Sequence, residues 1–238
     1  MVFLAPEPPL TDLLDVPEAD DPAFMHGALE PVTARVGAWL MLDNFCDIAH
    51  FPFLHAATIG TPESAVVDFT VERHGLGMNV YSRHPFPNRE DPGVAAGIRP
   101  LLQERVLEYR YRAPFSICLR IDYVEAGGTN VLDFYVQPES DDSCRIYTTV
   151  HRNDLDGDDA RMAECVAFER KILDEDLGLQ ERYVDRRLPI DVTAEVHVKA
   201  DRMTIELRRI LAELVASAGS GADAGLREAT TTGAHLAR

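Results

Sequence analysis

The middle of the chain is a succession of short segments in which apolar and polar residues alternate, with turn-forming residues between them. Alternation places every second side chain on the same face of a strand, so each segment predicts a strand with one buried face. Gly75 alone separates the first two segments, as in a hairpin. This regular spacing favours an antiparallel meander. The predicted strands are residues 65–74, 76–84, 104–112, 115–124, 130–138 and 143–152.

The last third of the chain changes to helical periodicity. Residues 158–187 are rich in helix-forming residues and contain no proline, and Asp158 or Asp159 can cap the start of this helix. A second helix is expected near residues 201–216, where five apolar residues recur at helical spacing. They are Met203, Leu207, Ile210, Leu211 and Leu214.

The two ends of the chain differ from this pattern. Residues 1–30 are rich in Pro, Asp, Glu and Ala and predict an extended arm, and residues 32–42 indicate a strand or a strand pair. Residues 217–238 are small, polar and aperiodic, which predicts a disordered tail. The expected fold class is α+β, with one domain at residues 31–216: a curved antiparallel sheet with a long C-terminal helix packed over it.

Composition and charge narrow the function classes. Of the 238 residues, 46% are hydrophobic and 26% are charged, as in an ordinary globular protein. The net charge of −17 disfavours nucleic acid and anionic membranes as partners. No apolar run reaches the length of a membrane span and the start lacks a signal-peptide pattern, so we expect a cytoplasmic protein. The four cysteines form no Cys-x-x-Cys or Cys-x-His pair, which predicts no iron–sulfur cluster in this chain.

The segment DNFCDIAHFPFLH carries the residues best suited to chemistry. His50 and His55 would point about 140° apart on an ideal helix. Two ligands at this spacing need a break or bulge, and Pro52 lies between them. Asp47 and Asn44 precede His50 at intervals of three residues, on the same helical face. A carboxylate beside a histidine commonly orients the imidazole of a metal ligand.

A metal site of this kind also needs an anionic ligand. Asp176 lies within the apolar stripe of the predicted helix, whereas Asp174 and Glu175 can face solvent. A buried carboxylate needs a partner, which is either a metal or a salt bridge to Arg170 or Arg182. Histidines in an apolar stretch are likewise often core residues with ordinary hydrogen bonds. Two imidazoles and one carboxylate leave positions open for dioxygen, as in non-haem Fe(II) oxygenases.

Together these residues resemble a known family. The pattern Asn-x2-Asp-x2-His-x4-His in DNFCDIAHFPFLHAATIG is similar to the iron-binding stretch of the Rieske non-haem iron oxygenases. The resemblance is closest to the vanillate O-demethylase and dicamba monooxygenase branch. It continues through LDEDLGLQERYVDRR to ADRMTIELRRIL, so it covers nearly the whole chain except the tail.

The resemblance implies a role for each of these residues. His50, His55 and Asp176 would bind mononuclear Fe(II), Asp47 would receive the electron from a Rieske cluster, and Asn44 would lie close to the iron. The implied fold is the helix-grip (START-like) type. Family members carry an N-terminal Rieske domain with Cys-x-His and Cys-x2-His ligands, which this sequence does not contain. We therefore expect a separate Rieske [2Fe–2S] protein or domain and an NAD(P)H-dependent reductase. The resemblance implies a ring-shaped homotrimer, but without the Rieske domains half of the usual contact between subunits is missing, so the expectation for this chain is a weak trimer or a monomer.

The expected function is O2-dependent monooxygenation, or O- or N-demethylation, of a small aromatic substrate that the sequence does not identify. Two alternatives remain open. Helix-grip folds enclose cavities, so the chain could instead be a redox-inactive ligand-binding or structural subunit. A zinc hydrolase could use the same three ligands, although no glutamate lies beside the histidines as in His-Glu-x-x-His.

Overall fold

The computed structural model describes residues 11–60 and 67–233, with side chains through residue 218. Within these ranges eight strands form one sheet in the order β1-β8-β7-β6-β5-β4-β3, and the short β2 pairs with another part of β8. All pairings are antiparallel. The strands are β1 (Met25–Ala28), β2 (Val32–Ala34), β3 (Phe69–His74), β4 (Gly77–Pro87), β5 (Leu102–Arg112), β6 (Ser116–Tyr123), β7 (Thr129–Ser140) and β8 (Ser143–Arg152).

The order of β3 to β8 follows the sequence, which confirms the meander that the alternation predicts. Gly75 has a φ of +55°, in the left-handed region that favours glycine, and it lies in the turn between β3 and β4. Along β5, buried side chains alternate with more exposed ones over nearly the whole strand. Residues 65–66 of the first predicted strand lie outside the described residues.

The N-terminal part differs from the expected arm, of which residues 1–10 lie outside the described part. Met25–Ala28 form β1, which pairs with β8 at the edge of the sheet. Of residues 32–42, only Val32–Ala34 form a strand, and helix α1 (Ala38–Phe45) follows. A short apolar run does not distinguish a buried helix from a strand by periodicity, and the Ala, Leu and Met of α1 are strong helix formers.

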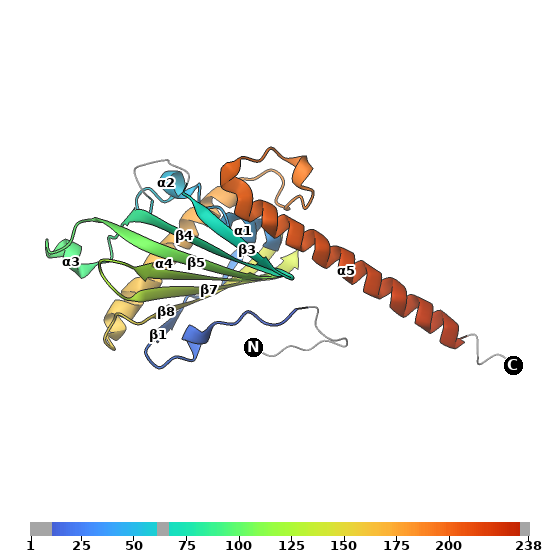
Figure 1. Ribbon diagram of the computed structural model, residues 1–238, viewed down its shortest axis with the longest axis horizontal. Coiled ribbons are helices and arrows are strands. Elements are labelled where there is room, and N and C mark those ends of the chain that lie inside the picture. Colours follow the sequence, from blue (N-terminus) through green and yellow to red (C-terminus); the bar gives the residue numbers. More distant parts are fainter. Residues whose placement is uncertain (1–10, 61–66, 234–238) are drawn as a thin grey trace.

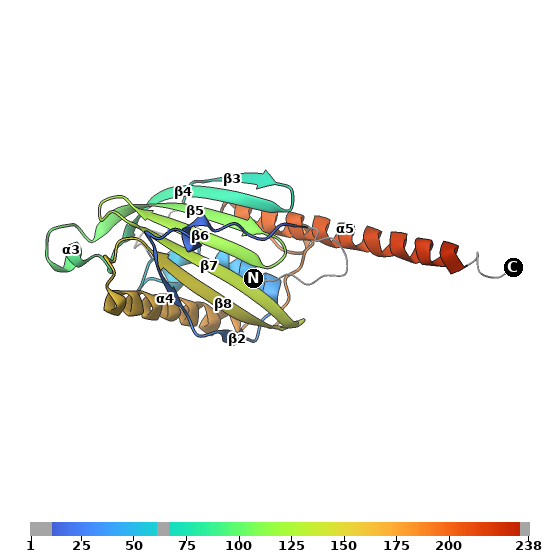
Figure 2. The same cartoon turned by 90° about the horizontal axis from the view of Figure 1, so that it is seen from below.

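Helix α4 (Asp159–Gln180) lies across one face of the sheet (Figures 1 and 2). Its start is capped as predicted, because the Asp158 carboxylate accepts hydrogen bonds from the backbone N–H groups of Ala160 and Arg161. The helix ends at Gln180, earlier than the predicted end at residue 187. The residues that follow include aromatic and β-branched side chains of lower helix propensity.

Helix α5 (Arg202–Gly233) begins beside the sheet and then extends away from the body of the molecule (Figure 1). Its first turns bury the predicted apolar side chains Met203, Leu207, Ile210 and Leu211. The helix continues to Gly233, into the residues 217–238 for which the sequence predicts a disordered tail. The segment contains no proline and several alanines, which favour a helix. Residues 234–238 lie outside the described part.

The core lies between α4 and the face of the sheet that this helix covers. It includes Leu107 and Tyr109 of β5, Phe134 of β7 and Leu173 of α4. The fold class is α+β, as the sequence predicts. Two single-turn helices, α2 (Phe51–Leu54) and α3 (Pro92–Ala95), lie in the connections. Among the described residues, no helix is both long and apolar enough to cross a membrane.

Candidate metal centre

His50 and His55 flank a single turn of helix, α2 (Phe51–Leu54), as its two capping residues. The first helix has already ended at Phe45, so Pro52 lies in the first turn of a new helix, where a backbone N–H donor is not needed. The break therefore precedes His50, and Pro52 does not kink a continuous helix. At His55 the backbone has left the helical conformation, with φ −99° and ψ 23°, and the two side chains converge.

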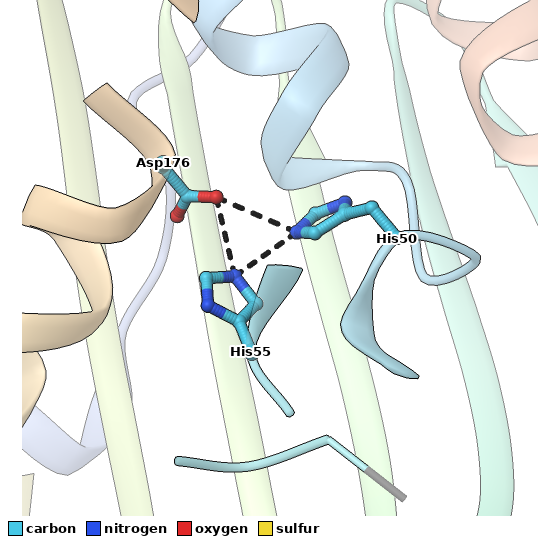
Figure 3. Close-up of side chains that lie close together, drawn as sticks. All are labelled: His50, His55 and Asp176. Atoms are coloured by element: carbon cyan, nitrogen blue, oxygen red, sulfur yellow. Dashed lines mark hydrogen bonds and ion pairs between the residues drawn. The ribbon is translucent and has the colours of Figure 1, made fainter. Parts of the chain in front are cut away.

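Three side-chain atoms from α4 and the α2 segment form a triangle (Figure 3). Nε2 of His50 lies 3.1 Å from Nε2 of His55, and Oδ1 of Asp176 lies 3.4 Å and 3.2 Å from these two nitrogens. A point about 2 Å from all three atoms exists in such a triangle, and this is the length of a bond from a transition metal to an imidazole nitrogen or a carboxylate oxygen. The structure thus brings together the three residues that the sequence singled out as ligands.

The Asp176 carboxylate has the properties of a metal ligand. Its side chain is largely buried, yet Oδ1 has no hydrogen-bond partner among the described residues. The alternative of a salt bridge does not hold, because Arg170 pairs with Asp174 at 2.9 Å and Arg182 forms no ion pair in the described part of the chain. An unpaired buried carboxylate oxygen is costly, so the donor set fits a cation bound between the three side chains.

Each histidine has a carboxylate on its second nitrogen. Oδ2 of Asp47 lies 3.4 Å from Nδ1 of His50, and Oδ1 of the same aspartate accepts the backbone N–H of Ala49 at 2.8 Å. Oε2 of Glu175 lies 2.8 Å from Nδ1 of His55 and also accepts the Thr58 hydroxyl at 2.9 Å. Both carboxylates favour the tautomer that leaves Nε2 free for a metal.

The role of Glu175 corrects a sequence expectation, since this residue was expected to face solvent. It lies next to Asp176 on α4, about 100° further around the helix, and this direction points at the His55 ring. Its position next to Asp176 was the one signal in the sequence. That position by itself does not distinguish a glutamate exposed to solvent from one that orients a histidine ring. Asp47, in contrast, lies where its spacing from His50 placed it.

In the absence of a metal, the charges around the three ligand residues favour a proton bound to the His50 imidazole. Burial alone would lower the pKa of His50, but the nearby carboxylates of Asp176 and Asp47 raise it to about 9. Burial likewise would raise the pKa of Asp176, yet the nearby side chains of His50, His55 and Asn44 lower it to about 2. Asn44 is therefore beside the Asp176 carboxyl group, as expected for an auxiliary residue. A metal would have to displace the His50 proton.

The ligand atoms belong to the wall of a cavity with about 980 Å³ of empty space, part of it open to solvent. Much of the remaining wall is apolar and comes from β5, β6 and β7. Glu169 of α4 and Thr148 of β8 also line the cavity. Apolar side chains from these three strands include Leu107, Leu119, Ile121, Leu132 and Phe134.

Comparison with known proteins agrees with this arrangement. The chain matches the vanillate O-demethylase oxygenase C-terminal domain over residues 34–217. The probable methylxanthine N7-demethylase NdmC of Pseudomonas sp. (strain TJI-51) is 27% identical over 208 residues, which are 84% of this chain and 70% of the relative. The methylxanthine N3-demethylase NdmB of Pseudomonas putida is 27% identical over 194 residues, 76% of this chain and 48% of the relative.

Solved structures share the fold. Pseudomonas putida CBB5 NdmA with caffeine superposes with a TM-score of 0.68 at 23% identity, covering 83% of this chain and 54% of the other. Dicamba monooxygenase bound to dicamba gives a TM-score of 0.70 at 16% identity, covering 87% and 63%. The chain thus spans about half the length of the Pseudomonas putida proteins. Because the family match covers most of the chain, the protein belongs to the vanillate O-demethylase oxygenase C-terminal domain family, the catalytic domains of Rieske oxygenases.

Proposed function

We propose that the chain is the catalytic iron part of a Rieske-type oxygenase that removes a methyl group from a small planar substrate. The observation that carries this proposal is the triangle of His50, His55 and Asp176 on the wall of a largely apolar cavity. Two neutral imidazoles and one carboxylate are the ligand set of mononuclear non-haem Fe(II) centres that react with dioxygen.

His50, His55 and Asp176 would hold the iron, and iron bound there would supply the redox chemistry with dioxygen. The other residues position these ligands. Asp47 and Glu175 keep the two imidazoles in the tautomer and orientation that present Nε2, since each carboxylate faces an Nδ1 atom. The apolar side chains of β5 to β7 exclude water from the space beside the ligands and bury the ring of a planar substrate.

N-demethylation is the reaction class that the similarity to two N-demethylases supports. One atom of dioxygen enters a methyl C–H bond, and the other is reduced to water with two electrons and two protons. The resulting hydroxymethyl group leaves as formaldehyde, and the substrate nitrogen keeps a hydrogen. The two electrons come, in this proposal, from a Rieske [2Fe–2S] cluster on a separate protein or domain and from an NAD(P)H-dependent reductase.

Asp47 is the proposed entry point for these electrons. It contacts His50 and its side chain remains 35% exposed, so a donor can reach it from outside. The residue lies in a groove that it shares with acidic neighbours, including Asp43, Glu195 and Asp201. Arg208 also lines this groove and pairs with Asp43 and Glu195, so the preference for a donor with a basic face rests on the net charge of −17. In a cyclic homotrimer the head-to-tail contacts would bring the cluster of one subunit to the Asp47 of its neighbour.

Reconstitution tests the proposal. The chain is loaded anaerobically with Fe(II) and supplied with a Rieske ferredoxin, its reductase, NADH, oxygen and a panel of N-methyl heterocycles and methoxyaromatic compounds. Formaldehyde release in proportion to NADH consumed is the expected result. If hydrogen peroxide supports turnover but no Rieske donor does, the iron site is as proposed and the partner is misidentified. No product with either oxidant across the panel would favour the redox-inactive ligand-binding function instead.

A further inference from the structure

The cavity is also lined by polar side chains that are not ligands of the candidate metal site. Glu169 lies on α4 seven residues before Asp176, so both side chains are on the same face of the helix. Two turns of helix separate them by about 10 Å along the axis. Ile172 and Leu173 lie between them and also line the cavity. A planar ligand on this face can therefore present one end to the metal ligands and the other to Glu169.

Both oxygens of the Glu169 carboxyl group can still bond to a ligand, because Oε1 can accept two hydrogen bonds and Asn130 supplies one. The amide Nδ2 of Asn130 donates to Oε1 at 2.9 Å, whereas Oε2 has no hydrogen bond among the described residues. Burial and the charge of Glu90 raise the pKa of Glu169 to about 7, although Asn130, Arg152 and Arg105 act in the opposite direction. A carboxyl group that is partly protonated near neutral pH can donate through one oxygen and accept through the other.

Further polar groups that line the cavity also lack some or all of their hydrogen-bond partners. The Tyr109 hydroxyl and Thr148 Oγ1 are buried without a hydrogen bond in the described part of the structure. The buried guanidinium of Arg105 lies 4.7 Å from the centre of the Phe86 ring. It donates from Nε to His84 at 3.0 Å and pairs with no carboxylate of the described residues.

His84 carries no charge of its own, because burial and the charge of Arg105 lower the pKa of His84 to about 3. The imidazole is therefore neutral and accepts the Arg105 hydrogen bond at Nε2. Each buried polar group that lacks a hydrogen-bond partner destabilises a protein. The presence of such groups around one cavity indicates a ligand with several hydrogen-bonding atoms, which distinguishes it from a plain aromatic ether.

We propose that Glu169 determines substrate specificity and that the substrate is a planar N-heterocycle with an N–H group beside a ring carbonyl. The substrate N–H donates to Oε1 of Glu169, and the protonated Oε2 donates to the neighbouring carbonyl. Arg105 and Tyr109 supply donors for a further carbonyl oxygen. This inference rests on the proposed function, since it assumes that the methyl group to be removed lies at the metal end of the cavity.

Theobromine and caffeine form a matched pair of probes. Both are planar methylated xanthines, but theobromine keeps an N–H between two ring carbonyls, and caffeine carries a methyl group on that nitrogen. Their affinities are measured by calorimetry for the wild-type chain, Glu169→Leu and Glu169→Gln. The control is Glu164→Leu, which makes the same change at an exposed position of α4.

The wild type should bind theobromine at least about 10-fold more tightly than caffeine, because the N-methyl group blocks the pair of hydrogen bonds. Glu169→Leu should weaken theobromine binding by about 10- to 100-fold and leave caffeine within about threefold, which abolishes the preference. Glu164→Leu should preserve it. The wild-type preference should decline as the pH rises above about 7, whereas Glu169→Gln should keep it, since an amide offers the same donor and acceptor at every pH.

Three results would overturn the inference: an undiminished preference in Glu169→Leu, equal binding of both xanthines by the wild type, or binding of neither. If Glu169→Leu fails to fold, the pH dependence of the wild type against Glu169→Gln decides the question. Metal loading and formaldehyde release are measured separately. A clear theobromine preference without formaldehyde release would support the role of Glu169 and contradict the proposed function.

Discussion

Replacing Glu175 by leucine removes the hydrogen-bond acceptor that faces Nδ1 of His55 at 2.8 Å. His55 is only 1% exposed, so water does not readily replace the lost carboxylate. Loss of such an orienting partner typically weakens metal binding 10- to 100-fold, which is about 1.4–2.7 kcal/mol. We expect the upper end for Glu175→Leu, because the Thr58 hydroxyl loses the same acceptor. Glu175→Gln keeps an amide oxygen and should weaken Fe(II) binding by only about 10-fold.

The assay is anaerobic competition for Fe(II) between the protein and a chelator of known affinity, with circular dichroism to confirm folding. Asp174→Asn is the matched control on the same helix, since Asp174 pairs with Arg170 at the surface and faces no ligand. Its Fe(II) affinity should stay within about twofold of the wild type. If folded Glu175→Leu also binds Fe(II) within twofold of the wild type, Glu175 does not orient His55 and this account of the site is incorrect.

Three further predictions concern the site and the fold. Metal affinity should rise with pH between about 6.5 and about 9, because the metal displaces a proton from His50, whose pKa is about 9 without metal. Competition with a chelator measures the affinity across this pH range. A metal affinity that does not change with pH would contradict the prediction. Asp47→Asn should keep most of its iron but lose turnover driven by a Rieske donor, so normal turnover would exclude Asp47 as the electron entry. Leu207→Ala should lower the free energy of unfolding in urea by about 2–5 kcal/mol, whereas Val215→Ala at the exposed surface should change it by less than about 0.5 kcal/mol.

The site could be predicted from sequence to the extent that its residues carry local patterns. His50, His55 and Asp47 lie within one short segment, and their spacing is set by consecutive turns of backbone. Asp176 was identifiable because a carboxylate inside an apolar helical stripe requires a partner. Glu175 carried no such signal, because its role depends on where α2 lies relative to α4, which no local pattern contains.

The same distinction explains the fold. Strands β4 and β5 alternate over most of their length, and β3 to β8 have consecutive partners, so the meander followed from the sequence. Strand β1 has only the residues Met25–Ala28, and its partner β8 lies more than a hundred residues away in the sequence. Its pairing is therefore a long-range contact that composition could not indicate. Glu169 was missed for a related reason, since only the packing of α4 against the sheet turns it toward the cavity.

The central claim, that His50, His55 and Asp176 hold one iron, is tested most directly by the metal content of the protein after anaerobic loading with Fe(II) and removal of unbound metal. The wild type should retain one iron per chain. His50→Ala and Asp176→Ala should each retain almost none while keeping the circular dichroism spectrum of the wild type, because the triangle of ligand atoms is broken. Full iron occupancy in either folded variant would contradict the account.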